Sequence, residues 1–302
     1  MSDLTYPQAI VMGLLQGVTE LFPVSSLGHS ILVPAWLGGD WEKLVTESDS
    51  AGHTPFLAFV VALHVATAVA LVLFYWRDWV RIVGGFISSL RHRSIEGDDA
   101  RLAWLIIVGT IPVGIVGLIA EKPLRVVFAT PLAASIFLFL NGLVLLTAEL
   151  LRRRTAAGRR RTAAGRHAAQ PSGNDRAMTS LTMWEAVGIG ACQILALLPG
   201  ISRSGVTISG GLLRRLVHED AAKFAFLLAT PVILAAGLLK IPELFGPEGH
   251  GIGGQVLVGS LCAFVAALAA VAFLARWFHT RTLYPFVVYC VLAGAISIVH
   301  FA

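Results

Sequence analysis

Long apolar segments separated by shorter polar ones run along the whole chain. Six of these segments approach the length that a helix needs to cross about 30 Å of hydrocarbon at about 1.5 Å per residue. They cover residues 56–76, 102–120, 131–151, 224–239, 256–275 and 283–301. A membrane barrel would show weak segments of period two instead. The pattern therefore predicts an all-α integral membrane protein.

Two further regions, residues 8–37 and 184–213, each contain two apolar pieces that are too short to cross a bilayer. The pieces of the first region are separated by the sequence PVSS at residues 23–26. In the second, residues 199–211 hold three serines, a threonine, an arginine and four glycines. Hydrocarbon tolerates such a polar, poorly helical stretch only where it lines a protein cavity or meets a partner. Each region is therefore predicted to be a re-entrant helical hairpin whose tip serves a ligand.

The composition agrees with this class of protein. Of the 302 residues, 56% are hydrophobic and 14% are charged, against about 25% charged residues in soluble domains. One loop, residues 152–180, carries a larger net positive charge than the +5 of the whole chain. In it the heptad RRRTAAG occurs at 152–158 and again at 159–165. The positive-inside rule predicts that this loop is cytoplasmic. We expect it to be solvated and disordered, to set the topology and contact anionic lipid, and not to bind nucleic acid.

The two hairpin regions also resemble each other. An alignment pairs Gln8 with Glu185, Gly13 with Gly190 and Gln16 with Gln193, and one residue of slippage then pairs Pro23 with Pro199. Each hairpin precedes three spans, so residues 1–151 and 181–302 are predicted to be two repeats. An odd number of spans per repeat inverts the second copy and brings both tips near the middle of the bilayer. With the basic loop inside, the first hairpin enters from the extracytoplasmic side.

The two tips carry the side chains of a phosphoryl-transfer site. Gln16 and Glu20 lie four residues apart and share a helix face. Ser26 and His29 lie three residues apart at the start of the returning helix. Arg203, in the second tip, adds a planar fork of donors that suits phosphate. A carboxylate, a hydroxyl, an imidazole and a guanidinium can together activate a nucleophile and stabilise phosphoryl charge.

Three polar residues outside the tips receive less specific interpretations. His64 and Thr67 lie within the first span and are expected either to pack or to support the site. Glu149 faces Arg152 and Arg153 at helical spacing, which indicates an ion pair at the membrane interface.

The first tip reads GVTELFPVSSLGH at residues 17–29, and the second reads PGISRSGVTISGG at residues 199–211. Both sequences resemble the signature regions of the undecaprenyl-diphosphatase family, also called bacitracin-resistance proteins. The resemblance extends over nearly the whole chain. It implies an enzyme of the bacterial plasma (inner) membrane that hydrolyses undecaprenyl diphosphate, a polyprenyl diphosphate lipid, to the monophosphate and inorganic phosphate. This reaction recycles the lipid carrier of peptidoglycan synthesis, and bacitracin binds its substrate. The active site is expected to open to the extracytoplasmic side.

The resemblance also implies roles for residues of both tips. Four residues are expected to carry out catalysis, namely Glu20, Ser26, His29 and Arg203. The resemblance also places Gln16, Ser202 and Thr207 in the binding of the substrate, and the hydroxyl and glycine content of the tips adds Ser25, Ser204 and Gly205 to this expectation. A divalent cation, Mg²⁺ or Ca²⁺, is expected as cofactor with Glu20 as its ligand. Gln16 carries an amide where a second carboxylate would help to hold such a cation.

Two questions stay open at the level of the sequence. Ser26 either attacks phosphorus or positions an attacking water, with Glu20 as base or metal ligand and His29 exchanging the proton. An inverted-repeat transporter of a lipid phosphate or small anion would share this architecture and would release no phosphate. A purely structural scaffold would not explain why an arginine, a glutamate and a histidine lie at two helix breaks.

Overall fold

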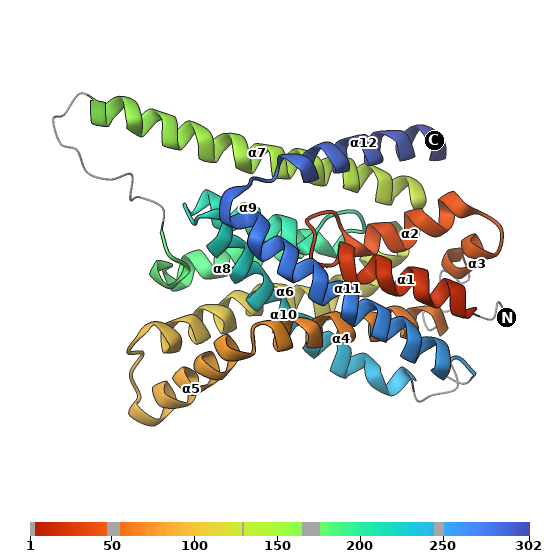
Figure 1. Ribbon diagram of the computed structural model, residues 1–302, viewed down its shortest axis with the longest axis horizontal. Helices are drawn as coiled ribbons and strands as arrows, with labels where there is room; N and C mark the ends of the chain where they lie inside the picture. The colour runs from red at the N-terminus through yellow and green to blue at the C-terminus, as the bar shows by residue number, and fades with distance from the viewer. Residues whose placement is uncertain (1–3, 47–54, 129, 165–175, 245–250) are drawn as a thin grey trace.

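The structure is a computed structural model that describes residues 4–46, 55–128, 130–164, 176–244 and 251–302. Within these ranges the regular secondary structure is helical, apart from one isolated bridge between Arg176 and Leu216. Figure 1 shows both ends of the chain on the same side of the helical bundle. The all-α prediction is therefore confirmed.

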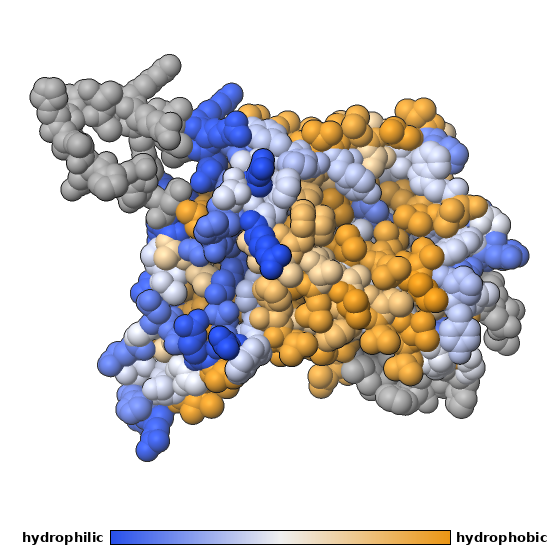
Figure 2. All heavy atoms as spheres, viewed as in Figure 1, coloured by the Kyte–Doolittle hydropathy of each residue, from blue (hydrophilic) through white to orange (hydrophobic). Residues whose placement is uncertain are grey.

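Five helices in the described part of the chain are long and apolar enough to cross a membrane. They are α6 (Asp98–Phe128), α7 (Pro131–Ala164), α10 (His218–Leu244), α11 (Gly253–Thr280) and α12 (Tyr284–Phe301). A sixth crossing results if α4 (Pro55–Phe74) is counted together with α5 (Trp76–His92), which follows it after a bend of 83°. Figure 2 shows a broad apolar belt with hydrophilic residues gathered at its ends. These features fit a multi-pass membrane protein.

Helix α5 is not among the predicted elements. Its exposed apolar side chains follow one another at spacings of four and three residues: Trp76, Val80, Val83, Ile87 and Leu90. Such spacing marks one face of a helix. The other side of α5 packs against α6, with Ile82 and Ser89 buried. The sequence thus contained a signal for a helix that turns away from α4 rather than continuing it.

The basic segment differs from the predicted disordered loop. Helix α7 continues to Ala164, so the first arginine heptad at 152–158 and most of the second are helical. Arginine and alanine rank among the strongest helix formers, and the next proline is Pro171. Residues 165–175 lie outside the described part of the chain, and the cytoplasmic location of the loop remains a prediction.

Short helices make up both hairpin regions. The first contains α1 (Tyr6–Thr19) and α2 (Ser26–Leu37), followed by α3 (Asp40–Thr46). The second contains the 3-10 turn η2 (Met178–Ser180), α8 (Met183–Cys192), the 3-10 turn η3 (Gln193–Leu197) and α9 (Arg203–Leu213). A sharp break in the chain separates α1 from α2 and η3 from α9, and these two breaks are the tips.

Side-chain caps start all four of the main hairpin helices. A capping box starts each outer helix, and a serine hydroxyl that accepts the backbone N–H three residues on starts each returning helix. The capping pairs are Thr5–Gln8 at α1, Thr182–Glu185 at α8, Ser25–Gly28 at α2 and Ser202–Gly205 at α9. The two hairpin regions therefore share their local chemistry as well as their helix order.

The outer hairpin helices α1 and α8 pack mainly against spans from the other half of the chain. Helix α1 packs on α11, α8 packs on α6, and α9 lies against α10 and α7. Helices α7 and α12 pack against each other, at the top of Figure 1. This packing holds the two tips inside the bundle, where Glu20, Ser26 and Ser202 are buried.

Candidate active site

The two tips are in direct contact. The backbone N–H of Gly200 donates to the Ser25 hydroxyl at 3.2 Å, and a Cβ on Gly28 would lie 2.9 Å from the Gly200 Cα. Both turns use the left-handed region, with φ of 108° at Gly200 and 71° at Ser25. For a residue with a side chain this conformation is strained, and it persists only where the surroundings hold it. The missing side chain at Gly28 therefore lets the second tip reach the cap of α2.

Asn141 of α7 ties both tips to the bundle. Its amide nitrogen donates to the Pro23 carbonyl and its amide oxygen accepts the Ser202 N–H, each at 3.0 Å. The Asn141 side chain is fully buried, so it satisfies backbone groups that have little access to solvent. The Ser202 and Ser204 hydroxyls also donate to the Phe22 carbonyl of the first tip. The Asn141 side chain and a few direct hydrogen bonds between the tips thus fix their relative position.

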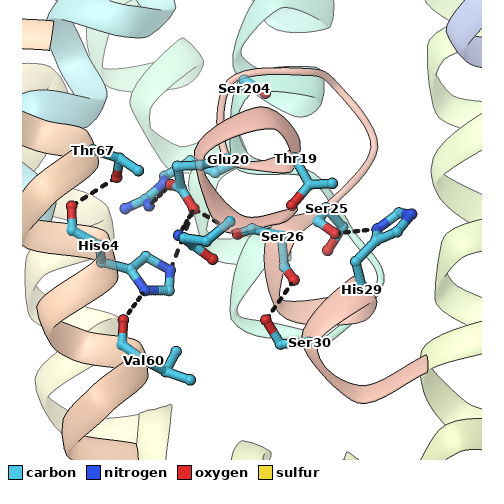
Figure 3. Close-up of polar contacts among 12 residues, drawn as sticks. Thr19, Glu20, Ser25, Ser26, His29, Ser30, Val60, His64, Thr67 and Ser204 are labelled. Atoms are coloured by element: carbon cyan, nitrogen blue, oxygen red, sulfur yellow. Dashed lines mark hydrogen bonds and ion pairs between the residues drawn. The ribbon is translucent and has the colours of Figure 1, made fainter. Parts of the chain in front are cut away.

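Glu20 is the centre of the polar contacts at the tips (Figure 3). Its Oε2 accepts the Ser26 hydroxyl at 2.5 Å and the Gln16 amide at 3.0 Å. Its Oε1 pairs with the Arg203 guanidinium of the other tip. The Glu20 side chain is 4% exposed, and a buried carboxylate persists only with such partners. The structure therefore brings together Gln16, Glu20, Ser26 and Arg203, as the sequence predicts.

Two helix N-termini meet at this cluster. Helix α2 begins at Ser26 and α9 begins at Arg203, so both side chains stand on the first residue of their helix. The free N–H groups and the dipole of a helix N-terminus favour an anion. The arrangement is suited to phosphate.

His64 of α4 completes the surroundings of Glu20. Its Nε2 lies 3.3 Å from Glu20 Oε2, and its Nδ1 lies 2.8 Å from the Val60 carbonyl. The Thr67 hydroxyl donates to the His64 carbonyl at 2.7 Å. Of the two interpretations for His64, packing and support of the site, the geometry agrees with the second.

His29 does not join this cluster. Its Nδ1 lies 2.7 Å from the Ser25 carbonyl and its Nε2 lies 2.6 Å from the Tyr289 hydroxyl on α12. In Figure 3 the His29 ring points away from Glu20, on the side opposite to His64. The spacing of three residues puts Ser26 and His29 on the same helix, but their polar groups have different partners. A proton exchange between His29 and the substrate stays a prediction.

The remaining predicted binding residues shape the second tip. The Ser202 hydroxyl accepts the Gly205 N–H at 3.1 Å and lies 3.0 Å from the Ser204 hydroxyl. The Thr207 hydroxyl donates to the Arg203 carbonyl at 2.8 Å, within α9. Contacts of these residues with a substrate stay a prediction.

Sequence reasoning missed Asn141 and Tyr289. An asparagine in the middle of an apolar span is itself a signal, because a polar side chain in hydrocarbon needs a partner. Tyr289 gave no comparable signal, since tyrosine is common near membrane interfaces.

The surroundings of Glu20 do not fit a divalent cation held by the protein. Mg²⁺ and Ca²⁺ bind oxygen ligands, whereas the Glu20 oxygens face donors of Gln16, Ser26 and Arg203 as well as the His64 ring. Gln16 Oε1 is buried without a hydrogen-bond partner and offers one neutral oxygen. Within the described residues, no three His, Cys, Asp or Glu side chains are grouped so that they could hold a metal ion. A cation here would meet one carboxylate that already has a guanidinium as partner.

The sequence matches the protein family described as Bacitracin resistance protein BacA over residues 9–296. It is 58% identical over 303 residues to the undecaprenyl-diphosphatase of Mycolicibacterium paratuberculosis, covering 100% of this chain and 99% of that protein. Identity to undecaprenyl-diphosphatase 2 of Frankia alni is 52% over 341 residues, with 100% and 99% covered. Identity to undecaprenyl-diphosphatase 2 of Chromobacterium violaceum is 41% over 296 residues, with 96% and 97% covered. Because the family match extends over residues 9–296 and includes both tips, the chain belongs to the bacitracin resistance protein BacA family.

Proposed function

We propose that this chain hydrolyses undecaprenyl diphosphate to undecaprenyl phosphate and inorganic phosphate. Membership of the family supports this, as do full-length relatives named undecaprenyl-diphosphatase. One observation of the site carries the proposal: the Ser26 hydroxyl lies 2.5 Å from Glu20, the carboxylate that pairs with Arg203. A nucleophile, its base and a phosphate-binding cation thus meet at one place. The activity recycles the lipid carrier of peptidoglycan synthesis and confers bacitracin resistance.

The Ser26 oxygen is the proposed nucleophile. It loses its proton to Glu20 and forms a bond to the terminal phosphorus, while the bridging P–O bond breaks and leaves its electron pair on undecaprenyl phosphate. Water then hydrolyses the phosphoserine and releases inorganic phosphate. Arg203 and the N-termini of α2 and α9 stabilise the negative charge of the transferred group.

The architecture that we propose is a pair of inverted repeats. One constant offset in residue number relates Thr5, Gln8, Gly13, Ser25 and Gly28 to Thr182, Glu185, Gly190, Ser202 and Gly205. The first two and last two of each set form the helix caps. This offset needs no slipped residue at the tips, in contrast to the alignment of Pro23 with Pro199.

The packing of the outer hairpin helices supports the same repeat. A Cβ on Gly13 of α1 would lie 2.3 Å from the Gly259 carbonyl oxygen of α11, and a Cβ on Gly190 of α8 would lie 1.8 Å from that of Gly109 in α6. Corresponding glycines thus allow corresponding helix pairs to approach closely. In this scheme α4 corresponds to α10 and α7 corresponds to α12. Each of these helices packs against its own counterpart, which also agrees with a two-fold arrangement.

We further propose that the protein lies in the bacterial plasma membrane with the basic end of α7 in the cytoplasm. The arginine-rich end of α7 and the far end of α5 extend from the same side of the helical bundle, at the left of Figure 1. Arginine clusters next to spans stay on the cytoplasmic side. With this orientation the first hairpin enters the membrane from the extracytoplasmic side, and we propose that the site opens to that side.

Phosphate release by the purified full chain in detergent tests the function. The parent and Arg91→Ala, whose side chain is exposed on α5, should release phosphate from undecaprenyl diphosphate. Arg203→Ala should lose about 10²–10³-fold, the typical effect of removing one donor that stabilises transition-state charge. Substrate labelled in its terminal phosphate should give phosphoserine in the parent and none in Ser26→Ala. A well-folded parent that releases no phosphate from several polyprenyl diphosphates would refute the proposal and favour a transporter, tested by flux in liposomes.

A further inference from the structure

Gln193 is a buried polar residue that the proposed mechanism does not use. It is the first residue of η3, the last turn of the second hairpin before its tip. The residue is 1% exposed. Within the ranges that the structure describes, neither its amide oxygen nor its amide nitrogen has a hydrogen-bond partner. Leu195, on the same turn, is 49% exposed, so the turn directs its amide into the bundle and a leucine outwards.

A free amide in the interior points to a ligand. Burying a donor and an acceptor without partners costs free energy, and an apolar side chain of similar volume would avoid that cost. Polar side chains that face the inside of a membrane bundle mark the sites and paths of substrates. The nitrogen of a glutamine amide offers two N–H donors. An anion with several oxygen atoms would therefore satisfy the Gln193 amide.

The repeat places Gln193 beside the second tip. The constant offset in residue number that relates the helix caps of the two hairpins also relates Gln16 to Gln193. Each glutamine follows by three residues the glycine at which its outer helix closely approaches a span, Gly13 or Gly190. Residues three apart lie on the same side of a helix. Both glutamines thus lie one turn nearer to their tips, on the side that meets the bundle.

The first tip shows how a glutamine at this position is used. Gln16 Nε2 donates to Glu20 Oε2 at 3.0 Å. The offset relates Glu20 to Leu197, whose side chain has no polar atom. Gln193 therefore lacks the carboxylate partner that Gln16 has within its own hairpin.

Arg203 supplies a positive charge on the helix that η3 contacts. It is the first residue of α9, and η3 packs against α9. The offset relates Arg203 to Ser26 of the first tip. Ser26 and Gln16 both donate to one oxygen of Glu20. By the same arrangement, Arg203 and Gln193 are directed at a common acceptor, and the oxygen atoms of a phosphate match both donors.

We propose that Gln193 is a substrate-binding residue of the phosphatase site, which donates from Nε2 to a phosphate oxygen of the diphosphate beside Arg203. This inference rests on the proposed function for the identity of the substrate. A neutral amide suits the position, because a carboxylate there would repel the diphosphate. Since the amide holds the diphosphate before and during the reaction, it lowers KM and leaves kcat nearly unchanged.

Gln193→Met tests the role, because methionine nearly keeps the volume of glutamine but cannot donate. We expect KM for undecaprenyl diphosphate to rise about 10–100-fold, as for the loss of a hydrogen bond to a charged group, with kcat nearly unchanged. The unfolding temperature should not fall, because the variant no longer buries an amide without partners. An active parent whose KM survives in Gln193→Met would overturn the proposal without affecting the phosphatase assignment.

Ser209→Ala is the matched control. The Ser209 hydroxyl lies on α9 of the same hairpin and is also buried without a partner among the described residues. The offset relates Ser209 to Leu32, so the repeat gives its hydroxyl no counterpart in the first hairpin. Ser209→Ala should keep the parental KM and kcat. A rise in KM equal to that of Gln193→Met would show that any polar group lost from this hairpin has the effect, and would overturn the proposal.

A binding measurement separates this inference from the reaction. The probe is a polyprenyl methylenediphosphonate, in which a CH₂ group replaces the bridging oxygen and prevents hydrolysis, titrated calorimetrically into the full chain in detergent. Gln193→Met should bind the probe about 10–100-fold more weakly than the parent. Gln193→Glu keeps the shape but adds a negative charge, and it should bind at least as weakly as Gln193→Met.

The outcomes are distinguishable. A parent that binds the probe more tightly than both variants but releases no phosphate would refute the proposed function and leave the role of Gln193 in binding intact. Binding by Gln193→Glu as tight as that of the parent would overturn the inference, because a carboxylate cannot donate. Weaker binding accompanied by a lower unfolding temperature in both variants would assign Gln193 a structural role and overturn it as well.

Discussion

Replacing Asn141 by alanine should loosen the connection between the two tips, which also contact each other directly. The change removes two 3.0 Å hydrogen bonds and leaves the Pro23 carbonyl and the Ser202 N–H buried without that partner. Each such group costs about 1–3 kcal/mol, so roughly 2–6 kcal/mol is at stake. About 1.4 kcal/mol corresponds to a tenfold change in an equilibrium. Even the lower end of this range, if it is lost from the assembled site, should therefore reduce kcat/KM at least tenfold.

The assay compares phosphate release and thermal unfolding in detergent across three variants. Asn141→Asp keeps an oxygen for the Ser202 N–H but brings a buried carboxylate against the Pro23 carbonyl, so it should not restore the parental values. Ser135→Ala is the matched control, because Ser135 is also fully buried on α7 but bonds only to its own helix at Pro131. If Asn141→Ala matches Ser135→Ala in both kcat/KM and unfolding temperature, the tips are held by other contacts and the reasoning fails.

Two further predictions concern the helix contacts and the cation. Gly190→Ala should lower the unfolding temperature clearly more than Gly114→Ala. The Cβ added at Gly190 would lie 1.8 Å from a backbone oxygen of α6, whereas the Cβ added at Gly114 has nothing within 4 Å. Equal effects would show that α8 and α6 are free to separate. Calorimetric titration of Mg²⁺ or Ca²⁺ into the substrate-free parent should give no saturable binding, whereas Gln16→Glu should acquire some; tight binding to the parent that Glu20→Gln abolishes would restore Glu20 as a metal ligand.

Hydropathy and a few polar residues at apolar breaks predict much of this molecule. The six long apolar segments correspond to helices because nothing but a helix satisfies the backbone of an isolated apolar segment in hydrocarbon. The approach of Glu20 and Arg203, far apart in the chain, follows from placing two hairpin tips at the same depth. A buried carboxylate and a partly buried guanidinium at that depth need each other.

The orientation of the two histidines could not be predicted in the same way. His64 lies on a helix that is apolar around its whole circumference, so its sequence does not tell which face meets the site, the lipid or another helix. The packing of α4 against α10 and α11 decides this rotation. His29 lies close to Ser26 in the sequence, but its side-chain rotamer is set by Tyr289, on a helix near the other end of the chain. Long-range packing thus assigns to His64 the contact that local spacing suggested for His29.

The charges at the tips give a physical reason for the amide at Gln16. Glu20 carries one negative charge and pairs with the positive charge of Arg203, so the two charges balance before the substrate binds. A carboxylate at position 16 would add a second negative charge and, four residues from Glu20 on one helix face, would repel the Glu20 carboxylate. A diphosphate is an anion and is favoured by Arg203 together with the N-termini of α2 and α9. The neutral Gln16 therefore leaves Arg203 and the two helix N-termini able to bind the anion without a second carboxylate beside them.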